Sequence, residues 1–136
     1  MLVVDASAIT DLLLERPSAQ RIGAHLLEHS FDLHAPHLLD VEVLSALRRV
    51  VAAQHASPAR AQEALLDLAD LPIERYPHQM LVRRVWSLRE NLSSYDAVYL
   101  ALAEALSDEG TPLLTTDVRF ARAARRHGET AVVLVE

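Results

Sequence analysis

Short, unbroken runs of apolar residues alternate along this chain with longer segments of helical periodicity. Each run is only a few residues long and lacks the apolar–polar alternation of a strand that faces water on one side. Continuous apolar strands are typical of a parallel sheet covered by helices on both faces, so the sequence predicts an α/β fold with a central, mostly parallel sheet of four to five short strands. We expect strands over 2–5, 31–35, 73–76, 113–115 and 131–135, and helices over 6–15, 18–28, 38–54, 57–70, 78–90, 95–106 and 117–127.

Composition limits the kinds of protein that this chain can be. Its 136 residues fit one domain, 1–136, and the absence of cysteine excludes disulfides, thiolate metal ligands and cysteine nucleophiles. All 13 basic residues are arginine, which excludes the P-loop lysine and Schiff-base chemistry. No apolar run is long enough to cross a bilayer, and the start lacks the regions of a signal peptide. We therefore expect a cytoplasmic protein without a membrane segment.

Two aspartates stand at the exits of predicted strands. Asp5 follows the first apolar run, and Asp117 comes just after the run at 113–115. In open parallel sheets, ligands bind beyond the carboxyl ends of the strands, where both carboxylates are expected. An aspartate in this position can equally cap the helix that follows, because its oxygens accept backbone N–H bonds there. For either residue alone, both interpretations stay open.

Two further acids lie inside strongly apolar helical segments, where a charge is costly to bury. Glu42 shares a helix face with small residues that leave room for a ligand, although an exposed glutamate is the simpler alternative; Asp40, about 200° away, can face solvent. Asp96 has apolar neighbours on almost every side, and aspartate is a poor helix former. Because gathered carboxylates repel one another, a cluster of them requires a cation. We predict a site for a divalent metal ion, suited to reactions of phosphate esters, at Asp5, Glu42, Asp96 and Asp117.

Hydroxyls and arginines accompany the four acids. Ser7 follows Asp5 by two positions, and Thr115 and Thr116 stand just before the last acid. These hydroxyls can orient carboxylates or bound water, with ordinary turn or capping roles as an equal alternative. Arginines at helical spacing can contact the phosphates of RNA, although solvated helix faces with local ion pairs are the simpler interpretation. These arginines are Arg83, Arg84, Arg89, Arg119, Arg122 and Arg126.

Two predicted helices carry more apolar residues than one modest core obviously needs. Part of this apolar surface can form a groove for an amphipathic helix of a partner protein, with burial in the core as the simpler interpretation. The residues concerned are Ile9, Leu12, Leu13, Leu14, Leu44, Leu47 and Val51.

The segments that contain the acids together resemble the PIN-domain family, and in particular the VapC-type toxins of bacterial toxin–antitoxin pairs. They are Val-Val-Asp-Ala-Ser at 3–7, Ala-Pro-His-Leu-Leu-Asp-Val-Glu-Val at 35–43, Ser-Tyr-Asp-Ala-Val-Tyr-Leu-Ala-Leu-Ala-Glu at 94–104 and Leu-Leu-Thr-Thr-Asp at 113–117. The resemblance extends over essentially the whole chain, and the third segment is the most specific. It implies a three-layer α/β/α fold, a homodimer and inhibition by a cognate VapB-type antitoxin.

The same resemblance implies an endoribonuclease that depends on Mg²⁺, for which Mn²⁺ can substitute, with the four acids as catalytic metal ligands. Water activated by the metal would cleave RNA and leave a 5′-phosphate and a 3′-hydroxyl. A metal-independent ribonuclease would instead use histidine pairs; the seven histidines form no such motif, and we expect most of them on the surface. Aspartyl-phosphate phosphatases need a second aspartate where this chain has Ser7. The stronger rival is a non-catalytic PIN-like module that binds RNA or protein.

Overall fold

The structure, a computed structural model, describes all residues, 1–136. Five parallel strands form one sheet in the order β3-β2-β1-β4-β5. The strands are β1 (Leu2–Val4), β2 (Leu33–Pro36), β3 (Ile73–Tyr76), β4 (Leu113–Thr115) and β5 (Val132–Leu134). The predicted α/β class and parallel sheet are confirmed, and every predicted strand is present.

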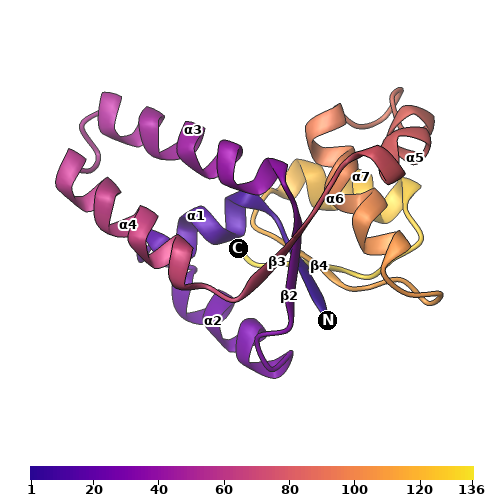
Figure 1. Ribbon diagram of the computed structural model, residues 1–136, viewed down its shortest axis with the longest axis horizontal. Coiled ribbons are helices and arrows are strands. Elements are labelled where there is room, and N and C mark those ends of the chain that lie inside the picture. The colour runs from indigo at the N-terminus through magenta and orange to yellow at the C-terminus, as the bar shows by residue number, and fades with distance from the viewer.

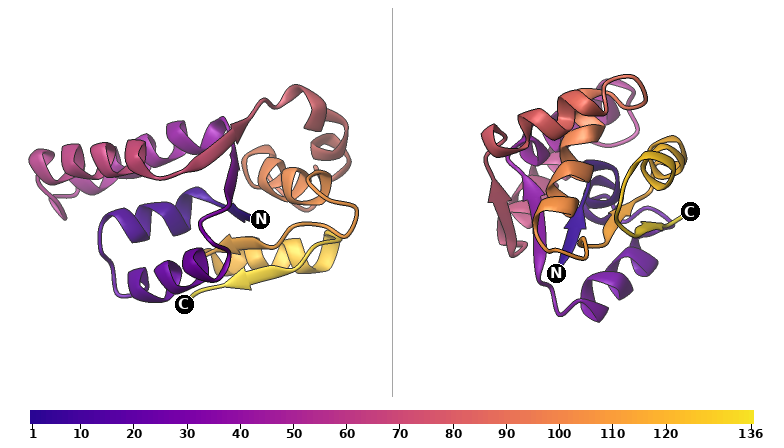
Figure 2. Two further views of the ribbon diagram at one scale, coloured as in Figure 1. Left: turned by 60° about the horizontal axis from the view of Figure 1, so that its bottom comes forward. Right: turned by 90° about the vertical axis from the view of Figure 1, so that its right-hand side faces the viewer.

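Helices cover both faces of the sheet, which gives three layers (Figures 1 and 2). The chain steps outward from β1 to β2 and β3, then returns to place β4 on the other side of β1. Because crossovers between parallel strands are right-handed, this reversal sends the later helices to the opposite face. One face carries α1 (Ala6–Leu13), α2 (Ala19–Glu28), α3 (Leu38–Ala52) and α4 (Pro58–Asp70); the other carries α5 (Val82–Ser87), α6 (Ser94–Ala105) and α7 (Val118–His127). None of the helices has the length and apolar character needed to cross a membrane.

The point of reversal lies between β1 and β4, the two neighbours in the middle of the sheet. Their register places Val4 beside Leu114, so both strands end at the same edge. Ligands of open α/β sheets bind at this kind of position, beyond the carboxyl ends of strands that diverge in chain order. The topology therefore brings the residues after β1 and after β4 together.

Helix α6 is the most buried helix of the fold and packs over β1, β2 and β4. All seven residues from 97 to 103 are buried, as the apolar sequence predicts. The Ser93 hydroxyl accepts a hydrogen bond of 3.2 Å from the backbone N–H of Asp96, and this cap fixes the start of the helix. The packing therefore places Asp96 in the first turn of a buried helix, near the edge where β1 and β4 end.

Strand β2 begins two residues later than the sequence predicts. Ser30 and Phe31 both have a φ of 54°, in the left-handed region, which an extended strand does not contain. The backbone N–H of Phe31 bonds instead to the carbonyl of Leu26, as part of the turn that ends α2. These local helix-terminating bonds outweigh the β-propensity of phenylalanine.

The predicted helix over 78–90 is also shorter in the structure, where a 3₁₀ turn at Gln79–Leu81 precedes α5. The Ser87 hydroxyl donates to the carbonyl of Arg84 at 2.6 Å, and the Leu88 N–H bonds to Val85, three residues back. Bonds of this kind tighten the backbone and compete with helix propagation. The helix accordingly ends at Ser87.

Two buried polar side chains, those of Ser18 and His34, make structural hydrogen bonds. Ser18 stands at the start of α2 but donates to Asp11 Oδ2 at 3.2 Å and does not cap the helix with its side chain. His34 is buried in β2, with Nδ1 2.7 Å from the Tyr76 hydroxyl and Nε2 2.8 Å from Asp32 Oδ1. Both ring nitrogens are thus used in structural hydrogen bonds toward the amino end of β2.

Candidate active site

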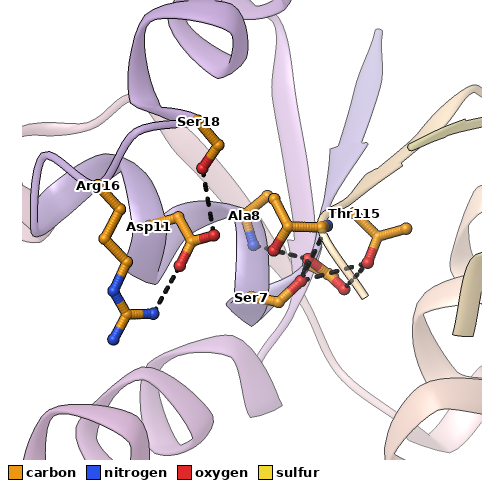
Figure 3. Close-up of polar contacts among 8 residues, drawn as sticks. Ser7, Ala8, Asp11, Arg16, Ser18 and Thr115 are labelled. Carbon is orange, nitrogen blue, oxygen red and sulfur yellow. Dashed lines mark hydrogen bonds and ion pairs between the residues drawn. The ribbon is translucent and has the colours of Figure 1, made fainter. Parts of the chain in front are cut away.

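Asp5 is the most enclosed of the four predicted acids. It follows β1 and caps α1, where its Oδ1 accepts hydrogen bonds from the Ala8 N–H at 2.9 Å and the Ser7 hydroxyl at 2.7 Å. Its Oδ2 accepts from the Thr115 hydroxyl at 2.5 Å. Figure 3 shows Ser7, Ala8 and Thr115, the three residues that bond to this carboxylate, close together. The capping role and the place in the acid cluster therefore occur together in one residue.

The two hydroxyls beside Asp5 also hold the connection between β4 and α7. Ser7 Oγ accepts the backbone N–H of Thr116 at 3.1 Å, and Thr115 Oγ1 accepts that of Asp117 at 3.0 Å. Each hydroxyl has one hydrogen, which it gives to Asp5, so the contact of 3.2 Å between the two oxygens shares no proton while Asp5 is ionised. The side chain of Thr116 makes no hydrogen bond; this residue takes part through its backbone.

Glu42 on α3 and Asp96 on α6 are half-buried beside Asp5. Burial, and then the charges of Asp96 and Asp5, raises the pKa of Glu42 to about 7. Burial also raises the pKa of Asp5 to about 6, although its hydrogen bonds oppose this and the charge of Asp96 adds to it. The pKa of Asp96 is raised by burial and then by the charge of Asp117. Each of the three acids is therefore close enough to another to disfavour its ionised form.

Asp117 is the exposed member of the group. It caps α7, where its Oδ1 accepts a hydrogen bond of 3.0 Å from the Phe120 N–H. The charge of Asp117 raises the pKa of Asp96, so Asp117 lies close to the other acids. As the side chains stand, no three carboxyl or imidazole groups are close enough together to hold a metal ion. The structure thus brings the four acids to one edge of the sheet, where neighbouring carboxylates repel one another. It does not place three of them close enough together to coordinate a metal ion.

Tyr99 belongs to this site although the sequence analysis did not select it. Its ring is 1% exposed, and its hydroxyl has no hydrogen-bond partner. Burial, followed by the charges of Glu42 and Asp5, raises the pKa of this hydroxyl. The spacing of three residues from Asp96 places both side chains on one face of α6, and this signal was available in the sequence.

Nearly the whole sequence of this chain matches one known protein family. The sequence pattern of the PIN domain matches residues 2–126. This chain belongs to the PIN domain family. Its acids lie at the carboxyl edge of a parallel sheet, in the order along the chain that the sequence motifs indicated.

This PIN domain is similar to several mycobacterial proteins. It is 45% identical to ribonuclease VapC1 of Mycobacterium tuberculosis over 122 residues, which cover 89% of each chain. It is 42% identical to ribonuclease VapC9 of the same species, with 88% of each chain covered. It is 35% identical to ribonuclease VapC12, with 98% of this chain and 97% of the relative covered. The resemblance to VapC-type proteins is confirmed.

A solved structure supports the fold of this PIN domain. PAE2754 from Pyrobaculum aerophilum matches it with a TM-score of 0.66 over 96% of this chain and 81% of that one. The two sequences are 22% identical, so this similarity bears on the three-layer fold alone.

The arginines singled out in the sequence differ in their surroundings. Arg84 is bound to Glu104 through two hydrogen bonds of 2.7 and 3.0 Å and also donates to the carbonyl of His127 at 3.3 Å. It therefore ties α5 to α6 and α7. Arg83 on α5, and Arg119 and Arg122 on α7, are exposed and make no hydrogen bond or ion pair within the chain. Arg83, Arg119 and Arg122 are therefore free to contact a ligand, whereas Arg84 is engaged in the fold.

The apolar residues expected to line a partner groove mostly lie in the core of this PIN domain. Ile9, Leu13 and Leu47 are buried, and only Leu44, at 49% exposure, faces solvent substantially. The remaining residues, Leu12, Leu14 and Val51, are half-buried. Burial is thus the correct interpretation for most of this apolar set.

Asp40 on α3, which was expected to face solvent, accepts hydrogen bonds of 2.6 and 2.8 Å from Arg75.

Proposed function

We propose that this protein is a Mg²⁺- or Mn²⁺-dependent endoribonuclease, the toxin of a toxin–antitoxin pair. One observation carries the proposal: four acids gather at the carboxyl edge of a parallel sheet, where burial raises the pKa values of Asp5, Glu42 and Asp96 and the charge of a neighbouring acid adds to each shift. Such repulsion is compensated when a cation binds. The similarity to mycobacterial proteins named as ribonucleases supports RNA as the substrate.

The residues present fit a hard divalent cation. Carboxylate oxygens are the ligands that Mg²⁺ and Mn²⁺ prefer, and the chain offers no cysteine to compete. Glu42 Oε1 is buried without a hydrogen-bond partner, which leaves an acceptor available for a ligand. Asp5, Glu42, Asp96 and Asp117 are the proposed ligands. Since no three acids stand within coordinating distance together, rotation of their side chains accompanies binding in this proposal.

When bound, the metal would polarise the scissile phosphate and lower the pKa of the attacking water. The protein's own residues supply the rest. Ser7 and Thr115 favour the ionised form of Asp5 and hold it in one orientation through the bonds described above. Arg119 and Arg122, on the helix that Asp117 caps, would attract RNA phosphates to this edge even though the whole chain has a formal charge of −6.

The products of RNA digestion test the mechanism directly. We expect cleavage that stops in excess EDTA, returns with Mg²⁺ or Mn²⁺, and leaves 5′-phosphate ends. Cleavage that persists in EDTA and yields cyclic phosphates would reject the metal mechanism.

A non-catalytic PIN-like module that binds RNA or protein is the second candidate. It is distinguished by Asp96→Asn, which keeps the size of the side chain and removes one proposed ligand. We expect this variant to fold and to lose RNA cleavage. The matched control is Asp40→Asn, which disturbs only the ion pair with Arg75 and should still cleave. If the wild type cleaves no RNA and binds no Mn²⁺, the binding-module alternative holds.

The proposal extends to protein partners, a cognate VapB-type antitoxin and a second copy of the chain, in the cytoplasm. Exposed apolar side chains on α5 and at the start of α6 support a protein contact: Val82 and Trp86 line one pocket together with Tyr95. Exposed aromatic residues of this kind are enriched at protein interfaces. Light scattering of the wild type should give the mass of a dimer, and Trp86→Ser should shift it toward the monomer.

A further inference from the structure

Two buried polar atoms face the acid cluster without hydrogen-bond partners, the Tyr99 hydroxyl on α6 and Glu42 Oε1 on α3. Most buried polar groups in folded proteins have a partner, because an unmet donor or acceptor is costly away from water. Two such atoms in one site are therefore a marked departure from ordinary packing. The other two unpartnered atoms of this kind, in Thr10 and Thr111, lie outside the acid cluster.

The two side chains are neighbours, yet no hydrogen bond joins these two atoms in the structure. Glu42 and Tyr99 each shift the pKa of the other, and the charges of Asp5 and Asp96 act on the same hydroxyl. Tyr99 therefore stands among three of the four acids. Its ring is locked by burial in the most enclosed helix of the fold, so the hydroxyl has a fixed position.

The chemistry of the pair is complementary. An ionised glutamate can only accept hydrogen bonds, and the tyrosine hydroxyl is a donor that keeps its proton in this negative, buried environment. Rotation of the Glu42 side chain would allow a hydrogen bond between the two groups. Coordination of a cation by one carboxylate oxygen leaves the other free to accept such a bond.

We propose that Tyr99 is a positioning residue for Glu42: when the divalent cation binds, the Tyr99 hydroxyl donates to the Glu42 carboxylate and fixes its orientation. This inference rests on the proposed function, because it assumes that Glu42 is a metal ligand. Loss of a hydrogen bond to a carboxylate that binds a metal typically weakens metal affinity by about 10- to 100-fold. A hydroxyl that only fills space in the core would have no such effect.

Calorimetric titration with Mn²⁺ alone tests the inference, with two tyrosine variants compared. Tyr99→Phe removes the unpartnered hydroxyl, and we expect about 10-fold weaker Mn²⁺ binding. The Tm of the metal-free variant should stay equal or rise, because a buried unsatisfied group has been removed. Tyr76→Phe is the matched control: it removes a hydroxyl that is bonded to His34, so it should lower the Tm and leave Mn²⁺ affinity unchanged.

A second comparison asks whether Tyr99 acts through Glu42. In a Glu42→Gln background the charged acceptor is missing, so Tyr99→Phe should change Mn²⁺ affinity by less than about twofold. An undiminished loss in that background would overturn the assignment to Glu42. Equal Mn²⁺ affinity of the wild type and Tyr99→Phe would overturn the inference while leaving the proposed function intact. Absence of Mn²⁺ binding by the wild type would overturn the proposed function and this inference with it.

Discussion

The Thr115 hydroxyl at the end of β4 donates a hydrogen bond to Asp5 Oδ2 at the end of β1, two residues 110 positions apart in the chain. The same oxygen of Thr115 accepts the backbone N–H of Asp117. One hydroxyl thus connects the most buried acid of the cluster with the segment that carries the most exposed one. The pairing of β1 with β4 makes this contact possible.

Replacement of this hydroxyl should affect both the fold and the proposed activity. Thr115→Val preserves the shape of the side chain but removes the donor to Asp5 and the acceptor for Asp117. We expect RNA cleavage to fall about 10- to 100-fold and the free energy of unfolding to fall by about 1 to 3 kcal/mol. The adjacent Thr116→Val is the control, because that hydroxyl makes no hydrogen bond. Equal damage from both variants would contradict the role assigned to Thr115.

The acid cluster should make the metal-free protein less stable as pH rises. The folded-state pKa values of about 6 for Asp5 and about 7 for Glu42 lie above their ordinary values of 3.8 and 4.5. The folded protein therefore holds protons that the unfolded chain has released, and this stabilisation, complete below about pH 4, is lost as pH rises through 6 to 7. Urea denaturation in EDTA should show a free energy of unfolding about 2 kcal/mol lower at pH 8 than at pH 5. A constant or rising value would contradict the coupling of these acids.

A divalent cation should reverse this trend. Because the ligands must be deprotonated, Mn²⁺ is expected to stabilise the protein more strongly at pH 8 than at pH 5. The rise in Tm on addition of Mn²⁺ at the two pH values measures the effect. An equal rise at both would indicate binding outside the carboxylate cluster.

Glu42→Gln should stabilise the metal-free protein at pH 8 by about 1 kcal/mol, a value reduced for solvent screening at this half-buried position. The substitution removes one of the repelling charges, and it should also reduce the stabilisation by Mn²⁺ without eliminating it, because the three other proposed ligands remain. Asp40→Asn, on the same helix, loses an ion pair with Arg75 and should lower stability instead. Chemical denaturation of both variants decides whether the charge of Glu42 is unfavourable in the absence of metal.

Adjacent arginines on α5 should separate structural from RNA-binding roles. Arg84→Ala leaves Glu104, whose side chain is only 14% exposed, without its partner, so we expect a marked loss of stability. Arg83→Ala removes an exposed, unpaired charge and should leave the Tm unchanged. Thermal denaturation distinguishes the two, and a stable Arg84→Ala would contradict the role given to this ion pair.

Arg119 and Arg122 should contribute to RNA binding through charge. Their joint replacement by alanine is expected to weaken RNA binding. The dependence of log affinity on log salt concentration should become shallower by an amount that corresponds to about one to two phosphate contacts. Arg48→Ala, on α3, removes an exposed arginine from another helix and serves as the control. Unchanged binding by the double variant would remove α7 from the RNA-binding surface.

Much of this architecture could be predicted from local patterns. Continuous apolar runs indicated the parallel strands, and the cost of placing Asp96 in an apolar helix marked it for attention. The boundaries that failed depend on individual hydrogen bonds: the left-handed turn at Ser30 and Phe31 delays β2, and the Ser87 hydroxyl ends α5. Such bonds depend on backbone geometry that side-chain periodicity does not encode.

The sequence predicts which acids form the site, but it does not predict how their side chains are arranged or what they contact. The sequence identified residues at strand exits, because the carboxyl ends of parallel strands share an edge. It did not distinguish Arg84, which is held by Glu104, from the free Arg83, since both have the same charge and neighbouring positions. The absence of a preformed cage among the acids also depends on side-chain rotamers, which no spacing rule specifies.

The link from Asp5 to Thr115 has a consequence for synthesis of the protein in the cell. Asp5 emerges from the ribosome before Thr115, which completes its surroundings and follows 110 residues later. A nascent chain, or a product of interrupted translation, holds the earlier acids without the partner strand that orders them. In the proposed ribonuclease, toxicity would therefore begin only after β4 has been synthesised.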